Sequence, residues 1–159
     1  MTLHDTDVEA IGLSVGGDTL HIEDDEGEWK YRLTRGNAAP LEGEVDPDAF
    51  SEWLTSIRSL ETIDAEVIDD AELVRRGLRA PRATLSMKGR GSAPDHTLVM
   101  GGSDMRGVFL RRDDELVSLV VPTDVEQQLS VSIVHFLPRR LLRERAEGLT
   151  QLITTGDNA

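Results

Sequence analysis

Two stretches of the sequence alternate between apolar and polar residues with a period of two, the pattern of strands that bury one face. In the first stretch Ile11, Leu13 and Val15 share one side, and further alternating segments follow turns in which glycine lies beside acidic residues. Such turns tolerate the positive φ angles of tight hairpins. The first stretch therefore predicts a three-stranded antiparallel meander, and the second predicts strands over 83–88, 96–100, 107–112 and 116–121.

The segment between the two meanders carries the signals of an amphipathic helix. Asp46 is suited to be its N-cap, and Pro47 to be its first residue, where a missing N–H costs nothing. Apolar residues recur at i, i+3, i+4 and i+7 from Phe50, and Trp53 belongs to this stripe. We therefore expect Trp53 to lie in the core. Residues 35–45 are interpreted as a polar connector.

Two further helices are predicted from their end signals. The second begins at Asp69, with Glu72 placed for a capping box, and is closed by Gly77 and Pro81. The third follows Pro122 and is expected to continue to Phe136. The order of elements predicts an α+β fold, in which antiparallel β meanders carry two central helices and one C-terminal helix packed on the sheet.

The chain length of 159 residues predicts one domain, which we place at residues 1–145. Residues 146–159 are interpreted as a tail. Within it, residues 149–157 repeat the apolar spacing and the Gly-Asp ending of residues 8–18. Two explanations of this repeat stay open: a chance match between short strands, or the first strand of a following repeat of the domain.

Charge is unevenly distributed around a net value of −13. Residues 1–72 hold 20 acidic and four basic side chains, an imbalance that disfavours nucleic acid and anionic lipid. No apolar stretch reaches the ~20 residues of a membrane-spanning helix, so we expect no direct membrane insertion. The strongest basic feature is Arg139, Arg140, Arg143 and Arg145, a candidate interaction surface that would pair with acidic surface of this domain or of the next.

Signals for chemistry are weak throughout the sequence. The four histidines lack metal-ligand spacing, and the absence of cysteine excludes a thiol nucleophile. The acidic run 23–28 lacks the pattern of a calcium loop, and the aspartate doublets fall where turns and caps favour aspartate. We therefore predict no catalytic residue, no metal ligand and no cofactor. The competing hypothesis is a metal-dependent hydrolase that uses the acidic turns.

Five segments resemble, in order along the chain, the landmarks of domain-of-unknown-function family 4340. The most specific is Gly77-Leu78-Arg79-Ala80-Pro81 followed by a strand. We assign structural roles to four residues within these landmarks: Trp29 and Trp53 as aromatic packing residues, Gly77 as a helix end, and Pro81 as the lead into a strand. The landmarks are residues 27–31, 47–60, 73–81, 98–101 and 139–142.

The resemblance implies a bacterial envelope protein, because family members typically carry such domains behind an N-terminal membrane anchor. Some members are auxiliary to ABC transporters of the gliding-motility type, and no catalytic residues are established for the family. We therefore predict a non-catalytic binding or scaffolding domain whose partner is a protein or a neighbouring repeat. It would lie on the extracytoplasmic face if it belongs to an anchored protein, and in the cytoplasm otherwise. The second hypothesis is a small acidic soluble adaptor or chaperone-like protein, which would co-purify with one basic client.

Overall fold

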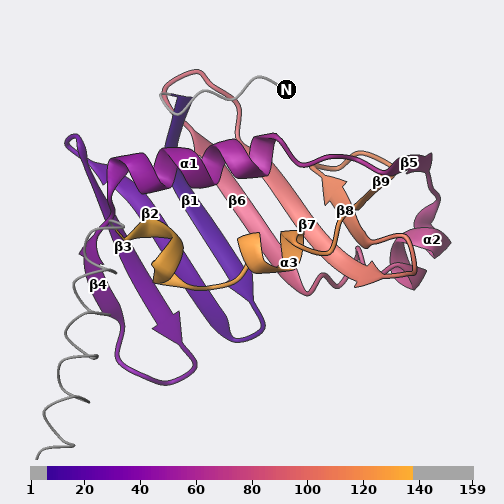
Figure 1. The fold of residues 1–159 in the computed structure, drawn as a ribbon, viewed down its shortest axis with the longest axis horizontal. Coiled ribbons are helices and arrows are strands. Elements are labelled where there is room, and N and C mark those ends of the chain that lie inside the picture. The colour runs from indigo at the N-terminus through magenta and orange to yellow at the C-terminus, as the bar shows by residue number, and fades with distance from the viewer. Residues whose placement is uncertain (1–6, 138–159) are drawn as a thin grey trace, which may run out of the picture.

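A computed structural model describes residues 7–137, and its main feature is one sheet of nine antiparallel strands (Figure 1). The spatial order is β4-β3-β2-β1-β6-β7-β8-β9-β5. The first meander, β1 to β3, has the predicted antiparallel pairing. The strands are β1 (Val8–Val15), β2 (Asp18–Asp25), β3 (Glu28–Arg35), β4 (Leu41–Glu44), β5 (Asp64–Val67), β6 (Ala83–Gly89), β7 (His96–Ser103), β8 (Val108–Arg112) and β9 (Val117–Val121).

The predicted α+β class with two central helices is wrong, because the chain is mostly β. Strands take 44% of the structure and helices 20%. The two meanders form one sheet because β1 pairs with β6, which places Ile11 opposite Met87 and Leu13 opposite Leu85. All four side chains are buried on one side, so the shared hydrophobic face joins what the sequence presents as separate units. The expected polar connector also contributes an edge strand, β4.

Helix α1 (Pro47–Arg58) matches the prediction and covers one face of the sheet (Figure 1). The Asp46 side chain accepts a hydrogen bond of 3.0 Å from the backbone N–H of Ala49, which satisfies a free donor of the first turn. The apolar stripe that contains Phe50 and Trp53 is buried against the sheet. We call this side of the sheet the helix face.

The predicted C-terminal helix is broken into two short pieces, α3 (Val125–Gln128) and the 3-10 turn η2 (Ile133–Phe136). The hydroxyl of Ser130 donates to the carbonyl of Gln127 at 2.7 Å. Such a local bond competes with helix continuation, which explains the break. The apolar side of the segment still reaches the core, since Phe136 is buried and its ring centroid lies 5.3 Å from that of Trp53.

Helix α2 (Asp70–Arg75) packs on the opposite side of the sheet, at the β7–β9 end (Figure 1). Asp69 caps it as predicted, accepting from the backbone N–H of Glu72 at 2.9 Å, but the predicted capping box is not completed, because the Glu72 carboxylate bonds Arg75 and Arg76 instead. Gly77 has φ of +73° and ends the helix, while Leu78 N–H reaches the carbonyl of Leu73 at 2.9 Å. These two leucines are buried together, which completes a Schellman motif.

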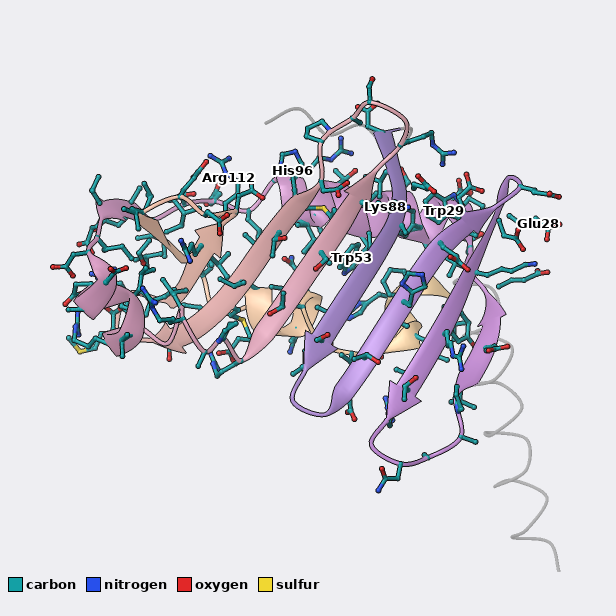
Figure 2. All side chains as sticks on the ribbon, turned by 180° about the vertical axis from the view of Figure 1, so that it is seen from behind. Glu28, Trp29, Trp53, Lys88, His96 and Arg112 are labelled. Carbon is teal, nitrogen blue, oxygen red and sulfur yellow. The ribbon has the colours of Figure 1, made fainter. Side chains whose placement is uncertain are left out.

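The remaining part of that side, over β4, β3, β2, β1 and β6, is covered by no helix of residues 7–137, as the reverse view shows (Figure 2). We call it the open face. No described helix is long and apolar enough to span a membrane. The tail and the arginine segment 139–145 lie outside the described residues.

Candidate functional site

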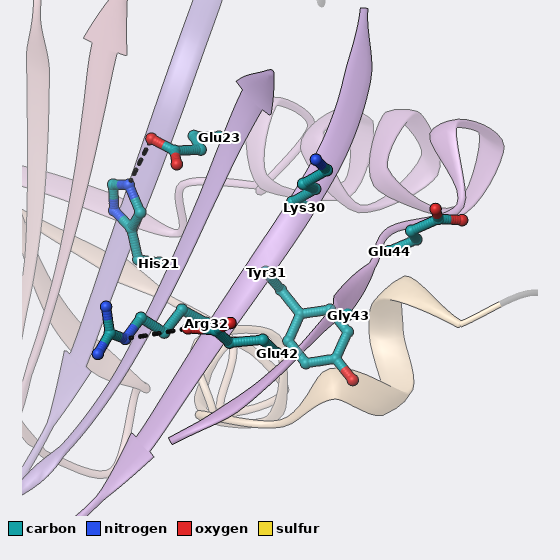
Figure 3. A pocket seen from close by; sticks show the side chains of 8 residues that line it. All are labelled: His21, Glu23, Lys30, Tyr31, Arg32, Glu42, Gly43 and Glu44. Carbon is teal, nitrogen blue, oxygen red and sulfur yellow. Dashed lines mark hydrogen bonds and ion pairs between the residues drawn. The ribbon is translucent and has the colours of Figure 1, made fainter. Parts of the chain in front are cut away.

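A groove of about 450 Å³ lies on strands β2, β3 and β4 (Figure 3). Strand register explains its composition, because residues opposite each other in antiparallel strands share a face. Lys30 lies opposite both Glu23 and Glu44, and Arg32 lies opposite Glu42. We call it the acidic groove, and its lining residues are His21, Glu23, Lys30, Tyr31, Arg32, Glu42, Gly43 and Glu44.

The charged side chains of the acidic groove are exposed and loosely paired. The Nε atom of Arg32 lies 3.7 Å from the Glu42 carboxylate, and the side chains are 60% and 66% exposed. Lys30 instead bonds Asp25 at 2.8 Å, and this hydrogen bond raises the pKa of Lys30. Glu44 forms no ion pair within 4.0 Å among residues 7–137. Exposed pairs of this kind add little to folding stability and remain able to exchange partners.

Gly43 has a packing role at the edge of the acidic groove. The ring of Tyr31 lies across it, and a Cβ atom at this position would come within 2.7 Å of the ring (Figure 3). The glycine therefore lets the aromatic ring pack directly on the edge strand. Glu42 and Glu44, on either side of it, face the groove as a result of strand alternation.

A second charged cluster surrounds the buried guanidinium of Arg76, which is only 7% exposed. Its Nη1 donates to the Ser118 hydroxyl at 3.1 Å, its Nε donates to Glu72 at 3.1 Å, and its Nη2 pairs with Glu66. The guanidinium carbon also lies 4.7 Å from the ring centre of Phe109. Because every side of the group is satisfied within the fold, the cluster anchors α2 to the sheet, and we assign it a structural role.

Acid should weaken this cluster in a defined pH range. The guanidinium groups of Arg75 and Arg76 lower the pKa of Glu72 from 4.5 to about 2. The folded state therefore binds fewer protons than the unfolded state, so the stabilisation is complete above pH 4.5 and is lost as pH falls toward 2. Chemical unfolding between these pH values should show a shallower pH dependence for Glu72→Gln than for the wild type.

Glu61→Gln, at an exposed position after α1, is the matched control and should keep the wild-type slope. Identical slopes for the wild type and Glu72→Gln would contradict the role given to Glu72.

The three histidines in the described part of the chain lie apart from one another. His21 is exposed in the acidic groove and bonds Glu23 at 3.3 Å. His96 bonds Asp113 through Nδ1 at 3.1 Å, and His135 lies 3.1 Å from the carbonyl of Gln127. Within residues 7–137 no three His, Asp or Glu side chains are grouped to hold a metal ion. His4 lies outside that range.

The acidic run 23–28 forms the β2–β3 hairpin tip, as the sequence predicts. Asp24, however, is not a solvated turn residue. Its side chain is only 12% exposed and pairs with Arg90 at 2.5 Å. This bond lowers the pKa of Asp24. It also ties the hairpin tip to the turn after β6.

The four residues to which the sequence assigns structural roles all lie in the described part of the chain. Trp53 is buried, and the ring of Trp29 stacks on Phe50 at 4.4 Å. Gly77 packs against the backbone of Gly102, because a Cβ atom on Gly77 would lie 3.3 Å from the backbone nitrogen of Gly102. Pro81 is half-buried two residues before β6. The four arginines of the candidate interaction surface, Arg139, Arg140, Arg143 and Arg145, fall outside the described residues.

The sequence did not indicate three residues of these two charged sites. They are Glu42 and Glu44 in the acidic groove and Arg76 in the second cluster. The alternation Leu41-Glu42-Gly43-Glu44 is a weak strand signal that could have indicated the edge strand. Nothing in the local sequence separates buried Arg76 from exposed Arg75.

The chain was compared with protein-family models, with curated proteins and with solved structures, and none of the three comparisons found a match.

Proposed function

We propose that this chain is a non-catalytic protein-binding domain whose acidic groove receives an arginine-rich segment of a second copy. The observation that carries the proposal is the acidic groove itself, a concave site on an otherwise uncovered sheet face, in which three carboxylates outnumber the cations of Lys30 and Arg32. Glu44 has no ion-pair partner among the described residues, and Glu42 is held only at 3.7 Å by Arg32. An incoming guanidinium could bond these carboxylates from strand β4 without breaking a buried interaction.

Charge complementarity selects the occupant. The chain carries −13 overall, and its acidic excess falls in residues 1–72, which include all the strands of the groove. A polyanion would be repelled by this field, whereas an arginine-rich protein segment would be attracted. Residues 139–145 of this same chain supply four arginines against one glutamate. A second copy therefore offers a segment of the required composition.

The biological setting of the proposal rests on the resemblance to family 4340. In that setting the domain is a scaffolding component of a bacterial envelope assembly, auxiliary to an ABC transporter. Successive domains would make the same contact in a tandem protein, with the arginine segment of one on the acidic groove of its neighbour.

A charge-swap experiment tests the contact. In sedimentation equilibrium at about 50 mM salt, Glu44→Arg and Arg140→Glu should each weaken self-association of the full chain about tenfold, because each reverses one of the charges on which the proposed contact depends. The double variant should recover part of the loss, since the exchanged charges in the groove and on the segment are again opposite. Raising salt to about 500 mM should weaken the wild-type association.

Asp48→Arg, at an exposed position of α1 outside the groove, makes the same charge change and should leave the association near that of the wild type. The proposal fails if the full chain stays monomeric at about 100 μM and about 50 mM salt. It also fails if Asp48→Arg matches Glu44→Arg, or if the double variant is no better than the single ones.

A further inference from the structure

A second pocket, of about 270 Å³, lies on the helix face at the C-terminal end of α1. Its walls are side chains of β6 to β9, and Ile57 and Leu60 close it from the α1 side. The sheet contributes Met87, Leu98 and Leu110, which also belong to the main hydrophobic core. The pocket therefore opens into the core beyond the end of α1, over a part of the sheet that the helix does not cover.

The pocket also has a polar part, which we call its mouth: His96, Thr97 and Arg112 come from the sheet, and Arg58 and Thr62 from the end of α1 and the segment after it. Strand register places Arg112 opposite Leu98 and His96 opposite Met87, so both point to the helix face, where alternation would otherwise continue with apolar residues. Figure 2 shows both residues at the same end of the sheet. No aspartate or glutamate lines the pocket, although the protein as a whole is strongly acidic.

Arg112 keeps free hydrogen-bonding capacity at this mouth. Its Nε and Nη2 atoms bond the Glu115 carboxylate, at 3.3 and 3.0 Å. Its Nη1 atom makes no hydrogen bond to residues 7–137, and the side chain is 39% exposed. A guanidinium can bind two carboxylates at once, since it presents five N–H donors in a planar fork.

We propose that this pocket binds an unbranched medium-chain carboxylate, with the alkyl chain against the core residues and the anionic head on Arg112. The volume corresponds to about nine water-sized groups, which fits a chain of about eight to ten carbons. The apolar lining residues contact the alkyl chain, and the guanidinium of Arg112 binds the carboxylate head. The pocket lies on the opposite side of the sheet from the acidic groove, so this site neither requires nor excludes the proposed protein contact.

Titration calorimetry on the full chain with hexanoate, octanoate, decanoate and dodecanoate tests the site. Affinity should rise about fourfold with each methylene that enters the pocket. It should stop rising near ten carbons, where the cavity is full, with a Kd of about 10–100 μM for decanoate. Octanol, which has the same chain and no charge, should bind more weakly than octanoate.

Arg112→Gln should weaken octanoate about tenfold and leave octanol unchanged, because only the ionic hydrogen bond is lost. Arg111→Gln is the matched control. It makes the same charge change at the next residue of β8, which lies opposite Val99 and points to the other side of the sheet. That variant should bind octanoate as the wild type does.

Leu119→Phe gives a second readout by filling a half-buried wall of the pocket, and should abolish octanoate binding while the thermal melt stays cooperative. The proposal is overturned if octanoate does not bind at about 5 mM, a range in which even weak ligands are detected. Equal effects of Arg111→Gln and Arg112→Gln, or unchanged binding to a folded Leu119→Phe variant, would also overturn it.

Discussion

Replacing Trp53 with alanine is expected to lower the free energy of unfolding by about 3–5 kcal/mol. The side chain is 5% exposed, and its ring contacts Phe50 and Phe136 at centroid distances of 6.5 and 5.3 Å. Its Nε1–H also donates to the carbonyl of Gln128 at 2.9 Å, which ties α1 to α3. Truncation would leave a cavity and an unpaired carbonyl. Urea denaturation followed by circular dichroism measures the loss.

Trp53→Phe is the control that separates packing from hydrogen bonding. It keeps an aromatic ring in the core and removes the donor, so it should cost only about 1–2 kcal/mol. If the free energy of unfolding of Trp53→Ala lies within about 1 kcal/mol of the wild-type value, Trp53 is not a core residue that joins the helices, and the packing described for the helix face is wrong.

Replacing Arg76 with alanine is expected to lower the free energy of unfolding by about 3 kcal/mol, although the residue is charged and its neighbours in the sequence are polar. The substitution removes the bond to Ser118, a side chain that is 0% exposed, together with both carboxylate partners. It also removes the contact with the ring of Phe109. Denaturation midpoints at neutral pH measure the effect.

Arg75→Ala provides a matched comparison at the adjacent position. Arg75 bonds the same Glu72 carboxylate at 2.7 Å, yet its side chain is 65% exposed, so its removal should cost less than about 1 kcal/mol. Equal losses from the two variants would show that burial of Arg76 does not decide its contribution.

The elements predicted correctly from the sequence are those defined by local signals. The first meander follows from alternation and from glycine-containing turns. Helix α1 follows from the Asp46 cap, Pro47 and the apolar stripe that includes Trp53, and all these features act within a few residues. The end of α2 at Gly77 is equally local, because only a left-handed residue closes a Schellman motif there.

The errors concern pairing between distant segments and competition within a helix. Nothing near Ile11 indicates that Met87 is its partner, so one sheet reads as two meanders and the fold is wrongly classed. The third helix has a correct apolar spacing and a buried Phe136. Apolar periodicity carries no information about the Ser130 hydroxyl, whose bond to the carbonyl of Gln127 competes with helix continuation.

The candidate site was the least predictable part of the molecule. Glu42 and Glu44 lie in a stretch that reads as a connector, and they face Lys30 and Arg32 only because β4 pairs with β3. The pocket near Arg112 depends on where α1 stops relative to four strands. Both sites are products of strand register, which a single sequence specifies only through contacts between segments far apart.

Intermolecular cross-linking tests the proposed protein contact most directly, and the natural absence of cysteine makes it specific. Thr34→Cys places a thiol on the open face, two residues from Arg32, and Leu142→Cys places one among the arginines of segment 139–145. Mixing the two variants with a short bis-maleimide should give a covalent dimer that high salt suppresses. Asp48→Cys mixed with Leu142→Cys should give little product. Equal yields from the two mixtures, or no dimer with Thr34→Cys, would contradict binding of the arginine segment in the acidic groove.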